Sequence, residues 1–273
     1  PQLRAGAIVG LGLDLDTTSF HLRWLAKDRL RAYGLDLSAE GELADALSVP
    51  LDATRTLGAL GGIVASRLAR EFQLGGPSFA VAGEDGSGLR ALEVAVRMLQ
   101  RRETDWMLAG AVDLAGDVRQ VRASGALRPW GSGRPFDRAA NGPTVGEGAA
   151  AVVLKRLDDA QRDGDRIYAV VRGFGAAGGA AIDPGSKRSG AYARAVADAQ
   201  REAGPGAVCL IAAHGSGDPL EDRDEARGLL VLFHATGQTW VFDGASWRIV
   251  PPPRSPLPRT GMQMAYDPFR QVT

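Results

Sequence analysis

Hydrophobic and polar positions follow two alternating patterns over the first 228 residues. Short, nearly continuous apolar runs are typical of buried strands, and six of them occur: Ala5–Leu15, Phe79–Gly83, Trp106–Leu114, Gly148–Leu154, Ile167–Gly173 and Ala207–Ala213. Between them, apolar residues recur at spacings of three and four, which predicts helices over Leu57–Phe72, from the turn at Glu84–Ser87 through about Arg102, and over the stretch containing Tyr192 and Ala203. Strands alternating with helices predict a layered α/β fold.

The pattern changes near Gly228. The residues beyond it contain six of the 15 prolines and two of the five tryptophans, and no lysine. Aromatic and small residues alternate over Thr239–Val250, and Asp243-Gly244 is typical of a hairpin turn. The sequence therefore predicts an α/β domain over residues 1–228 and a short β-rich tail over residues 229–273.

Composition narrows the function classes. The chain has 273 residues, and its 32 Lys plus Arg balance its 32 Asp plus Glu, so no overall positive field favours nucleic acid. No apolar run approaches the roughly 20 residues that a membrane helix needs. The single cysteine, Cys209, cannot form an intramolecular disulfide. With no secretory leader after Pro1, we expect a cytoplasmic protein that binds neither nucleic acid nor membrane.

Common cofactor and metal motifs are not found. The Gly10–Gly12 turn lacks the third glycine of a dinucleotide-binding loop, and no glycine-lysine pair forms a phosphate loop. One cysteine beside three histidines does not make a Cys-rich zinc site. The acidic run after His214 lacks calcium-loop spacing and is interpreted as a solvated helix start; it comprises Asp218, Glu221, Asp222, Asp224 and Glu225. We expect no cofactor and no metal.

Three stretches carry a specific resemblance. They are GGPSFAVAGEDGSGLRAL (Gly75–Leu92), RPFDRAANGPTVGEGAAAVVLKRL (Arg134–Leu157) and AAHGSGDPLEDRDEA (Ala212–Ala226). In this order and spacing they resemble the β-ketoacyl synthases of fatty-acid and polyketide assembly. The opening AIVGLGLDLDTTSFHLRW (Ala7–Trp24) resembles the ketosynthase-like domains of polyunsaturated-fatty-acid-type or related iterative synthases. The resemblance implies a thiolase-like layered α/β core whose C-terminal half is incomplete in this chain.

The resemblance also implies that this chain differs from the family at the position of the catalytic nucleophile. The family uses a cysteine at a strand-to-helix turn, where the helix N-terminus favours the thiolate and backbone N–H groups form an oxyanion hole. Aligning Pro77-Ser78 and Leu89 without gaps puts Asp85 at that position. Cys209 does not replace the thiol, because it falls inside a predicted strand and is interpreted as a small buried hydrophobic residue.

His214, in AHGSGDP, matches the family's first catalytic histidine, and its place at a strand end favours a site role. The family's second histidine and a lysine lie further downstream. Here the last lysine is Lys187, the only later histidine is His234, whose surroundings do not fit, and His21 aligns with no catalytic position. The catalytic candidates are therefore His214 and the replaced nucleophile position Asp85.

The tail has its own resemblance. Residues Gly228–Arg270, where the thiolase half should continue, resemble one blade of a kelch-type β-propeller. Propeller blades bury their sheets against neighbouring blades, so one blade is expected to be marginally stable alone.

Three functions remain open. The chain resembles a chain-length factor, a non-elongating subunit that pairs with an active ketosynthase; alternatively it decarboxylates malonyl carrier protein, or it is a degenerate fusion that acts as a binding protein. The expected partners are acyl carrier protein and either an active ketosynthase subunit or a homodimer mate. In the family, the strand carrying the nucleophile packs against its symmetry mate, which predicts a dimer through the neighbourhood of Phe79 and Val81.

Overall fold

A computed structural model describes residues 4–12, 25, 28–34, 52–116, 118–178, 189–206, 208, 210–235, 239–242 and 247–250. The chain divides into two compact units. The first contains residues 1–123 and 146–168, and the second contains residues 124–145 and 169–273. Each unit is described by itself.

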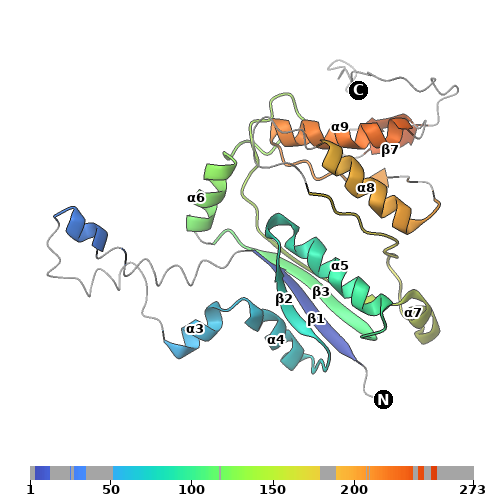
Figure 1. Cartoon of the computed structure of the whole chain (residues 1–273), viewed down its shortest axis with the longest axis horizontal. Coiled ribbons are helices and arrows are strands. Elements are labelled where there is room, and N and C mark those ends of the chain that lie inside the picture. Colours follow the sequence, from blue (N-terminus) through green and yellow to red (C-terminus); the bar gives the residue numbers. More distant parts are fainter. Residues whose placement is uncertain are drawn as a thin grey trace. The chain divides into compact units, whose positions relative to one another are not determined.

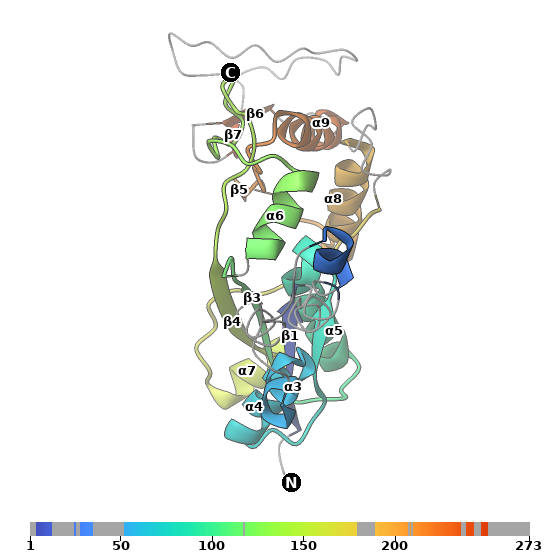
Figure 2. The same ribbon diagram turned by 90° about the vertical axis from the view of Figure 1, so that its left-hand side faces the viewer.

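The first unit is built on a four-stranded sheet in the order β2-β1-β3-β4. The strands are β1 (Ala5–Leu11), β2 (Ser78–Ala82), β3 (Trp106–Asp113) and β4 (Gly148–Lys155). β1 pairs in parallel with both β2 and β3, whereas β4 runs antiparallel to β3 at the outer edge of the sheet (Figure 2). Parallel neighbours require crossover connections, and helices supply them here.

Helix α5 (Ser87–Gln100) lies along one face of this sheet (Figure 1) and contacts β1 and β3. It follows β2 through a short 3-10 turn, η1 (Glu84–Gly86). Helix α4 (Gly62–Glu71) contacts β2 and β1. Further helices that begin in this unit are α3 (Ala53–Ala59), α6 (Val118–Leu127), which runs across the division between the units, and α7 (Leu157–Asp163).

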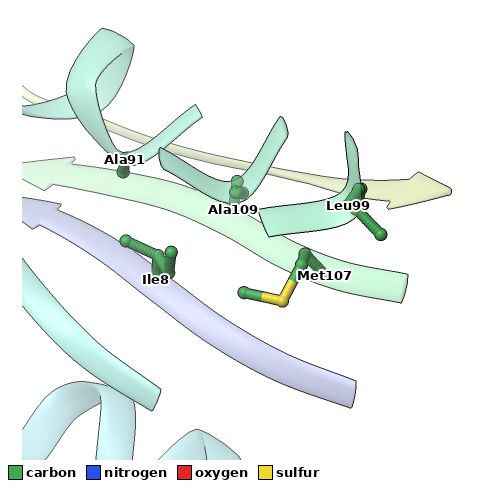
Figure 3. Packing of buried hydrophobic residues seen from close by; sticks show 6 residues of the cluster. Ile8, Ala91, Leu99, Met107 and Ala109 are labelled. Atoms are coloured by element: carbon green, nitrogen blue, oxygen red, sulfur yellow. The ribbon is translucent and has the colours of Figure 1, made fainter. Parts of the chain in front are cut away.

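The core of the first unit lies between α5 and the sheet. Apolar side chains of the two layers meet there (Figure 3), and the buried cluster consists of Ile8, Ala91, Ala95, Leu99, Met107 and Ala109. The three residues from α5 recur at spacings of four, so they share one helical face. Two alanines on that face let the helix approach the strands closely, and this packing fixes the position at which α5 begins.

Gly10 sets the closest approach of helix and sheet. A Cβ atom at Gly10 would lie 2.5 Å from the backbone of Ser87 and 2.6 Å from the Gly88 nitrogen, distances that no real side chain tolerates. Because these are backbone atoms of the first turn of α5, they cannot move aside as a flexible side chain can. A glycine at this position is therefore required to bring the start of α5 onto β1.

An ionic cluster joins β4 and α7 to the rest of the first unit. The Arg156 guanidinium donates to the carbonyl oxygen of Leu99 at 3.2 Å, to that of Thr104 at 2.5 Å and to Asp105 at 3.3 Å. It also pairs with Asp159 of α7, and the Lys155 ammonium bonds Asp163 at 2.5 Å. These contacts tie the end of the antiparallel strand to the loop before β3.

The second unit contains two packed helices and a small sheet. The helices are α8 (Ser189–Ala203) and α9 (Pro219–Ala235). The sheet has the order β5-β7-β6 and is antiparallel throughout, with β5 at Leu210–Ile211, β6 at Thr239–Phe242 and β7 at Trp247–Val250. Residues 131–143 also belong to this unit and bond to the loop before α9.

The predicted elements are largely present, with three corrections. The helix predicted over Leu57–Phe72 is interrupted, because Leu60 adopts an extended conformation with φ −82° and ψ 111° and ends α3 before α4 begins. The strand predicted over Ala207–Ala213 is reduced to Leu210–Ile211, and Cys209 lies outside the described residues. The strand predicted over Ile167–Gly173 is not formed; that segment carries exposed apolar side chains, and no described strand pairs with it.

The tail hairpin has the predicted pairing. β6 and β7 are antiparallel, with Thr239 opposite Val250 and Phe242 opposite Trp247, while the turn containing Asp243-Gly244 lies outside the described residues. Helix α9 runs through position 228, where the domain boundary is predicted. The change in composition at that position therefore falls within an element, and the boundary stays a prediction.

Candidate functional site

Asp85 occupies a tight turn between a strand and a long helix. It is the middle residue of η1, directly after β2 and directly before α5, and it is exposed. The predicted strand, sharp turn and helix are thus all present. Glu84, its neighbour, has a positive φ of 52°, which a non-glycine residue adopts only when surrounding contacts hold it.

Ser87 provides those contacts. Its buried hydroxyl accepts a hydrogen bond from the Gly83 N–H at 2.9 Å. The same oxygen lies 2.8 Å from the Leu11 carbonyl and 2.7 Å from the Glu84 carbonyl, and its single proton is shared between these two acceptors. One side chain therefore closes the turn around Asp85 and joins it to the end of β1.

His214 lies in a loop between β5 and α9 and is exposed. The loop is organised by Glu225, whose carboxylate accepts the His214 N–H at 2.7 Å and the Gly215 N–H at 3.0 Å. The Glu225 side chain belongs to a residue only 6% exposed. Hydrogen bonds from backbone N–H groups to a buried carboxylate are charge-assisted and strong, so this contact fixes the backbone at the histidine.

Asp222 organises the rest of the same loop. Its carboxylate accepts the Gly217 N–H at 3.2 Å, the Ser216 hydroxyl at 3.3 Å and the Phe136 N–H at 2.7 Å, and the residue is 3% exposed. Gly142 donates its N–H to the Gly217 carbonyl at 3.0 Å. Two of the three family-like stretches are therefore bonded to each other in the second unit.

The loop needs glycine at two positions. Gly215 and Gly217 have φ of +59° and +80°, in the left-handed region that favours glycine. A Cβ atom at Gly215 would lie 2.8 Å from the Pro135 side chain. The turn Gly-Ser-Gly after the histidine thus allows the chain to reverse tightly against residues 135 and 136.

The interpretation of the acidic run is corrected in part. Asp218 caps α9, since its carboxylate accepts the N–H groups of Leu220 at 2.8 Å and Glu221 at 3.0 Å, as expected at a helix start. The run is not a solvated face, however, because Asp222, Asp224 and Glu225 are all buried. Burial is tolerated because backbone N–H groups satisfy the carboxylates of Asp222 and Glu225. In the sequence, Asp222 and Glu225 are marked as loop-organising residues only by their spacing of three, directly after a helix cap.

Asp85 belongs to the first unit and His214 to the second, so each is described only with the contacts inside its own unit.

Across the described residues, no group of three or more His, Cys, Asp or Glu side chains is arranged to hold a metal ion. Within the same residues, no helix is long and apolar enough to cross a membrane.

Comparison with known proteins identifies the family. The profile of the β-ketoacyl synthase N-terminal domain matches residues 5–160, and that of the β-ketoacyl synthase C-terminal domain matches residues 168–242. The first match alone covers more than half of the chain, so the chain belongs to the β-ketoacyl synthase family. The C-terminal match also extends past position 228 to the end of β6.

Polyketide synthases are among the similar proteins. The chain is 37% identical over 210 residues to a phenolphthiocerol/phthiocerol polyketide synthase of Mycobacterium tuberculosis. It is 38% identical over 181 residues to the phthioceranic/hydroxyphthioceranic acid synthase of the same species. These matches cover 74% and 64% of this chain but only 9% and 8% of the relatives. The chain therefore spans about a tenth of the length of these large proteins.

Solved ketosynthases confirm the thiolase-like fold. The ketosynthase from module 1 of the bacillaene synthase of Bacillus amyloliquefaciens FZB42 aligns with a TM-score of 0.64 and 22% identity, over 85% of this chain and 37% of its own. The oxazolomycin ketosynthase domain OzmH KS7 of Streptomyces albus JA3453 gives the same TM-score, with 26% identity over 86% of this chain and 37% of its own. The chain thus has part of a ketosynthase fold.

Proposed function

We propose that this chain is a ketosynthase-family domain that does not elongate an acyl chain by itself and that acts beside an active ketosynthase, as a chain-length factor does. The observation that carries the proposal is Asp85 in the turn between β2 and α5. Family resemblance puts the acyl-accepting cysteine at this position. A carboxylate does not replace a thiolate there, because it does not form the thioester that holds the growing chain.

The surroundings of Asp85 support a scaffold role. A carboxylate at the start of a helix is favoured by the partial positive charge of the helix's first N–H groups. Asp85 precedes a helix of 14 residues, and the Ser87 hydroxyl holds the turn in place. The substitution therefore suits the fold while it removes acyl transfer.

The remaining catalytic groups of the family also differ in this chain. Resemblance places a lysine and a second histidine downstream of His214, but the chain has no lysine after Lys187, and the C-terminal family match ends at residue 242. The His214 loop, by contrast, has the buried carboxylates that organise it. This chain thus combines an ordered histidine loop with the loss of the nucleophile.

The partners proposed for this chain are acyl carrier protein and an active ketosynthase. The curated relatives are much longer polyketide synthases, which supports a role beside further domains. A homodimer through β2 is the other proposed association. Among the described strands, β2 lies at the edge of its sheet, and Phe79 on it is 38% exposed, which supports this interface.

The tail is the basis of the third function, a binding protein. The kelch-like character of the tail rests on its sequence, while the β6–β7 hairpin supports a β-rich tail. Strand β7 also pairs with β5, which lies upstream of His214. The proposed division therefore keeps residues 1–228 as the ketosynthase-like part and residues 229–273 as the tail, although one sheet includes strands from both.

The three functions are separated by one set of measurements on the purified chain. Co-purification with a ketosynthase that has its cysteine and both histidines supports the proposed function. Release of carbon dioxide from malonyl carrier protein supports decarboxylation instead, although the Asp85 carboxylate would repel the malonyl carboxylate. The absence of both results points to a binding role. The proposed chain-length-factor role is contradicted if carbon dioxide is released. It is also contradicted if the chain neither co-purifies with a ketosynthase nor releases carbon dioxide.

Restoring the thiol provides a direct test of the missing groups. We expect the Asp85→Cys variant to accept an acyl group without forming a ketoacyl product. The thiol recovers the helix N-terminus and oxyanion donors, contributions of roughly 3 kcal/mol in related acyl chemistry, but groups that act as one unit do not restore rate singly. Acyl loading and product are measured separately, with acyl and malonyl carrier protein supplied. The unchanged chain should do neither, and product formed by the isolated variant contradicts the proposal.

A further inference from the structure

The chain contains one asparagine, Asn141, and a glycine follows it. An asparagine before a glycine is the pair most prone to lose the side-chain amide, because glycine has no side chain to shield its backbone nitrogen. The pair belongs to residues 131–143 of the second unit, which fold back on themselves and are called the arch here. The arch is bonded to the His214 loop, so a chemical change in it would reach a candidate site residue.

The fold requires the glycine of this pair. Gly142 is buried and has a φ of +136°, and a Cβ atom on it would meet the Pro129 carbonyl oxygen. Its N–H donates to the Gly217 carbonyl at 3.0 Å, and its own carbonyl accepts the Gly133 N–H at 3.1 Å. Gly142 is therefore held on both sides, and no other residue type fits its place.

The asparagine side chain is held as well. Its Oδ1 accepts the Ser132 N–H at 2.7 Å and the Ser132 hydroxyl at 2.9 Å. A backbone N–H only donates, so the oxygen of the amide must face Ser132, and the amide nitrogen lies on the other side. Asn141 is nevertheless exposed, so water has access to it. The residue is thus restrained by hydrogen bonds and not by burial.

We propose that Asn141 is a deamidation site that the closed arch holds unreactive and that opening of the arch releases. In the reaction, the Gly142 nitrogen gives its proton to a base in the solvent and bonds to Cγ of Asn141. The Cγ–Nδ2 bond breaks, and the amide nitrogen takes a proton from water and leaves as ammonia. A second water then opens the succinimide ring at one of its two carbonyl carbons, which leaves aspartate or isoaspartate at position 141.

The first step is incompatible with the closed arch. The Gly142 nitrogen has to leave the Gly217 carbonyl before it approaches Cγ, and the Asn141 side chain has to leave both donors of Ser132. Three hydrogen bonds must therefore break together. The reaction then proceeds only in the locally opened state, and its rate follows the population of that state.

The two products differ in their effect on the arch. Aspartate keeps an oxygen where the amide oxygen was, so the donors of Ser132 keep their acceptor and the arch closes again. Isoaspartate carries its main chain through Cβ, which adds one atom to the backbone directly before Gly142. Because Pro129 and Gly217 leave Gly142 no room to shift, the bond to Gly217 should not re-form. Isoaspartate should therefore release the His214 loop from the arch.

Peptide mapping by mass spectrometry tests the site, with the full chain held in mildly alkaline buffer, folded or in guanidinium chloride. We expect deamidation at Asn141 to be about tenfold or more slower in the folded chain. Ser132→Ala removes one donor and should speed the folded chain about threefold or more. Ser124→Ala, on α6 of the same unit, is the matched control and should not. Equal rates in the folded and unfolded chain, no reaction in either, or Ser132→Ala reacting at the rate of the control overturns the proposal.

Hydrogen exchange tests the effect on the His214 loop. After ageing in guanidinium chloride and refolding, the isoaspartate-containing fraction should exchange the N–H groups of Gly142 and Gly215 about tenfold or more faster than the fresh chain. Asn141→Asp, which encodes the other product, should keep the protection of the fresh chain. Asn141→Gln aged in the same way is the matched control, because glutamine loses its amide far more slowly, and it accounts for damage elsewhere. Equal change on ageing in the unchanged chain and in Asn141→Gln, or lost protection in Asn141→Asp, contradicts the proposed release.

Discussion

Single carboxylates determine the conformation of the His214 loop. Glu225 and Asp222 are buried and together accept four backbone N–H groups, those of His214, Gly215, Gly217 and Phe136. A donor that loses its acceptor in a buried place costs more than the hydrogen bond contributes, because water cannot replace the acceptor. The loop should therefore be more sensitive to these two residues than to changes at exposed acids.

Removing the Glu225 carboxylate tests this. Glu225→Ala leaves two N–H groups without their acceptor, and we expect the free energy of unfolding of the second unit to fall by about 1–3 kcal/mol for each group left unsatisfied. Glu225→Gln keeps one acceptor oxygen and should lose less. Urea unfolding provides the measurement, with the exposed Glu103→Gln as the control. Equal stability of the alanine and glutamine variants would show that the two bonds do not hold the loop.

Ser87 organises the turn around Asp85, as Glu225 and Asp222 organise the His214 loop. Ser87→Ala removes the acceptor of the Gly83 N–H and the donor to β1, so we expect a loss of about 1–3 kcal/mol in the stability of the first unit. Ser66→Ala is matched to it, since Ser66 is an exposed helical serine whose hydroxyl bonds only its own helix, to the Gly62 carbonyl. Chemical denaturation compares the two variants, and similar losses would contradict the assigned role.

At the scale of elements, the ionic cluster between β4, α7 and the loop before β3 makes the first unit sensitive to acid. Hydrogen bonds from Arg162 and then Arg156 lower the pKa of Asp159, and Lys155 followed by Arg162 lowers that of Asp163. The Arg4 backbone N–H lowers the pKa of Asp105. A carboxyl whose pKa is lower in the folded state stabilises the fold above its unfolded pKa of about 4, and this stability is lost as pH falls through the folded pKa.

We therefore expect the unfolding temperature of the first unit to fall steeply below about pH 4. The Asp159→Asn variant should be less stable than the unchanged chain at pH 6, and the difference should shrink toward pH 3. The hydrogen bonds that the Lys155 ammonium donates to Asp163 and Asp165 raise the pKa of Lys155, so its contribution is present at neutral pH and is lost only at strongly alkaline pH. Asp113→Asn, at the end of β3 outside the cluster, is the control. A constant difference across this range contradicts the expectation.

A helix or strand could be predicted from the sequence where its apolar repeat coincides with a neighbouring element against which it packs or pairs. The helix after Asp85 is predicted almost to its observed length, because Leu92 and Leu99 repeat on a face that meets the sheet. Ile167–Gly173 has the composition of a strand, but a strand forms only where a neighbour accepts its hydrogen bonds, and none of the described strands does so. Composition alone could not supply that information. The burial of Asp222 and Glu225 was hidden for a similar reason, because their spacing after the helix cap does not show which backbone N–H groups fold back onto them.

At the scale of the whole molecule, the tail and the ketosynthase-like region share one sheet. β7 lies between β5 and β6, so its backbone bonds on both sides, with Arg248 opposite both Leu210 and Val241. The described strands of the tail, β6 and β7, are thus bonded into the same sheet as β5.

Placing proline in that central strand tests the shared sheet. Arg248→Pro removes an N–H and fixes φ, and proline is excluded from central strands. We expect hydrogen exchange to accelerate both at Leu210–Ile211 and at β6, while the strands of the first unit keep their protection. Arg223→Ala, an exposed position on α9, provides the control. Faster exchange at β6 alone would show that β5 is held independently of the tail.

The contact between Gly10 and the first turn of α5 has a consequence for how the protein tolerates change. A saturation library normally shows depletion where large side chains are buried and tolerance where no side chain exists. Position 10 has no side chain and yet should show depletion of every substitution, because any Cβ atom would meet the backbone of Ser87. Even alanine, the smallest replacement, would displace the start of α5 and the Asp85 turn with it. The identity of a residue 75 positions upstream thus limits which sequences can present any functional group at position 85.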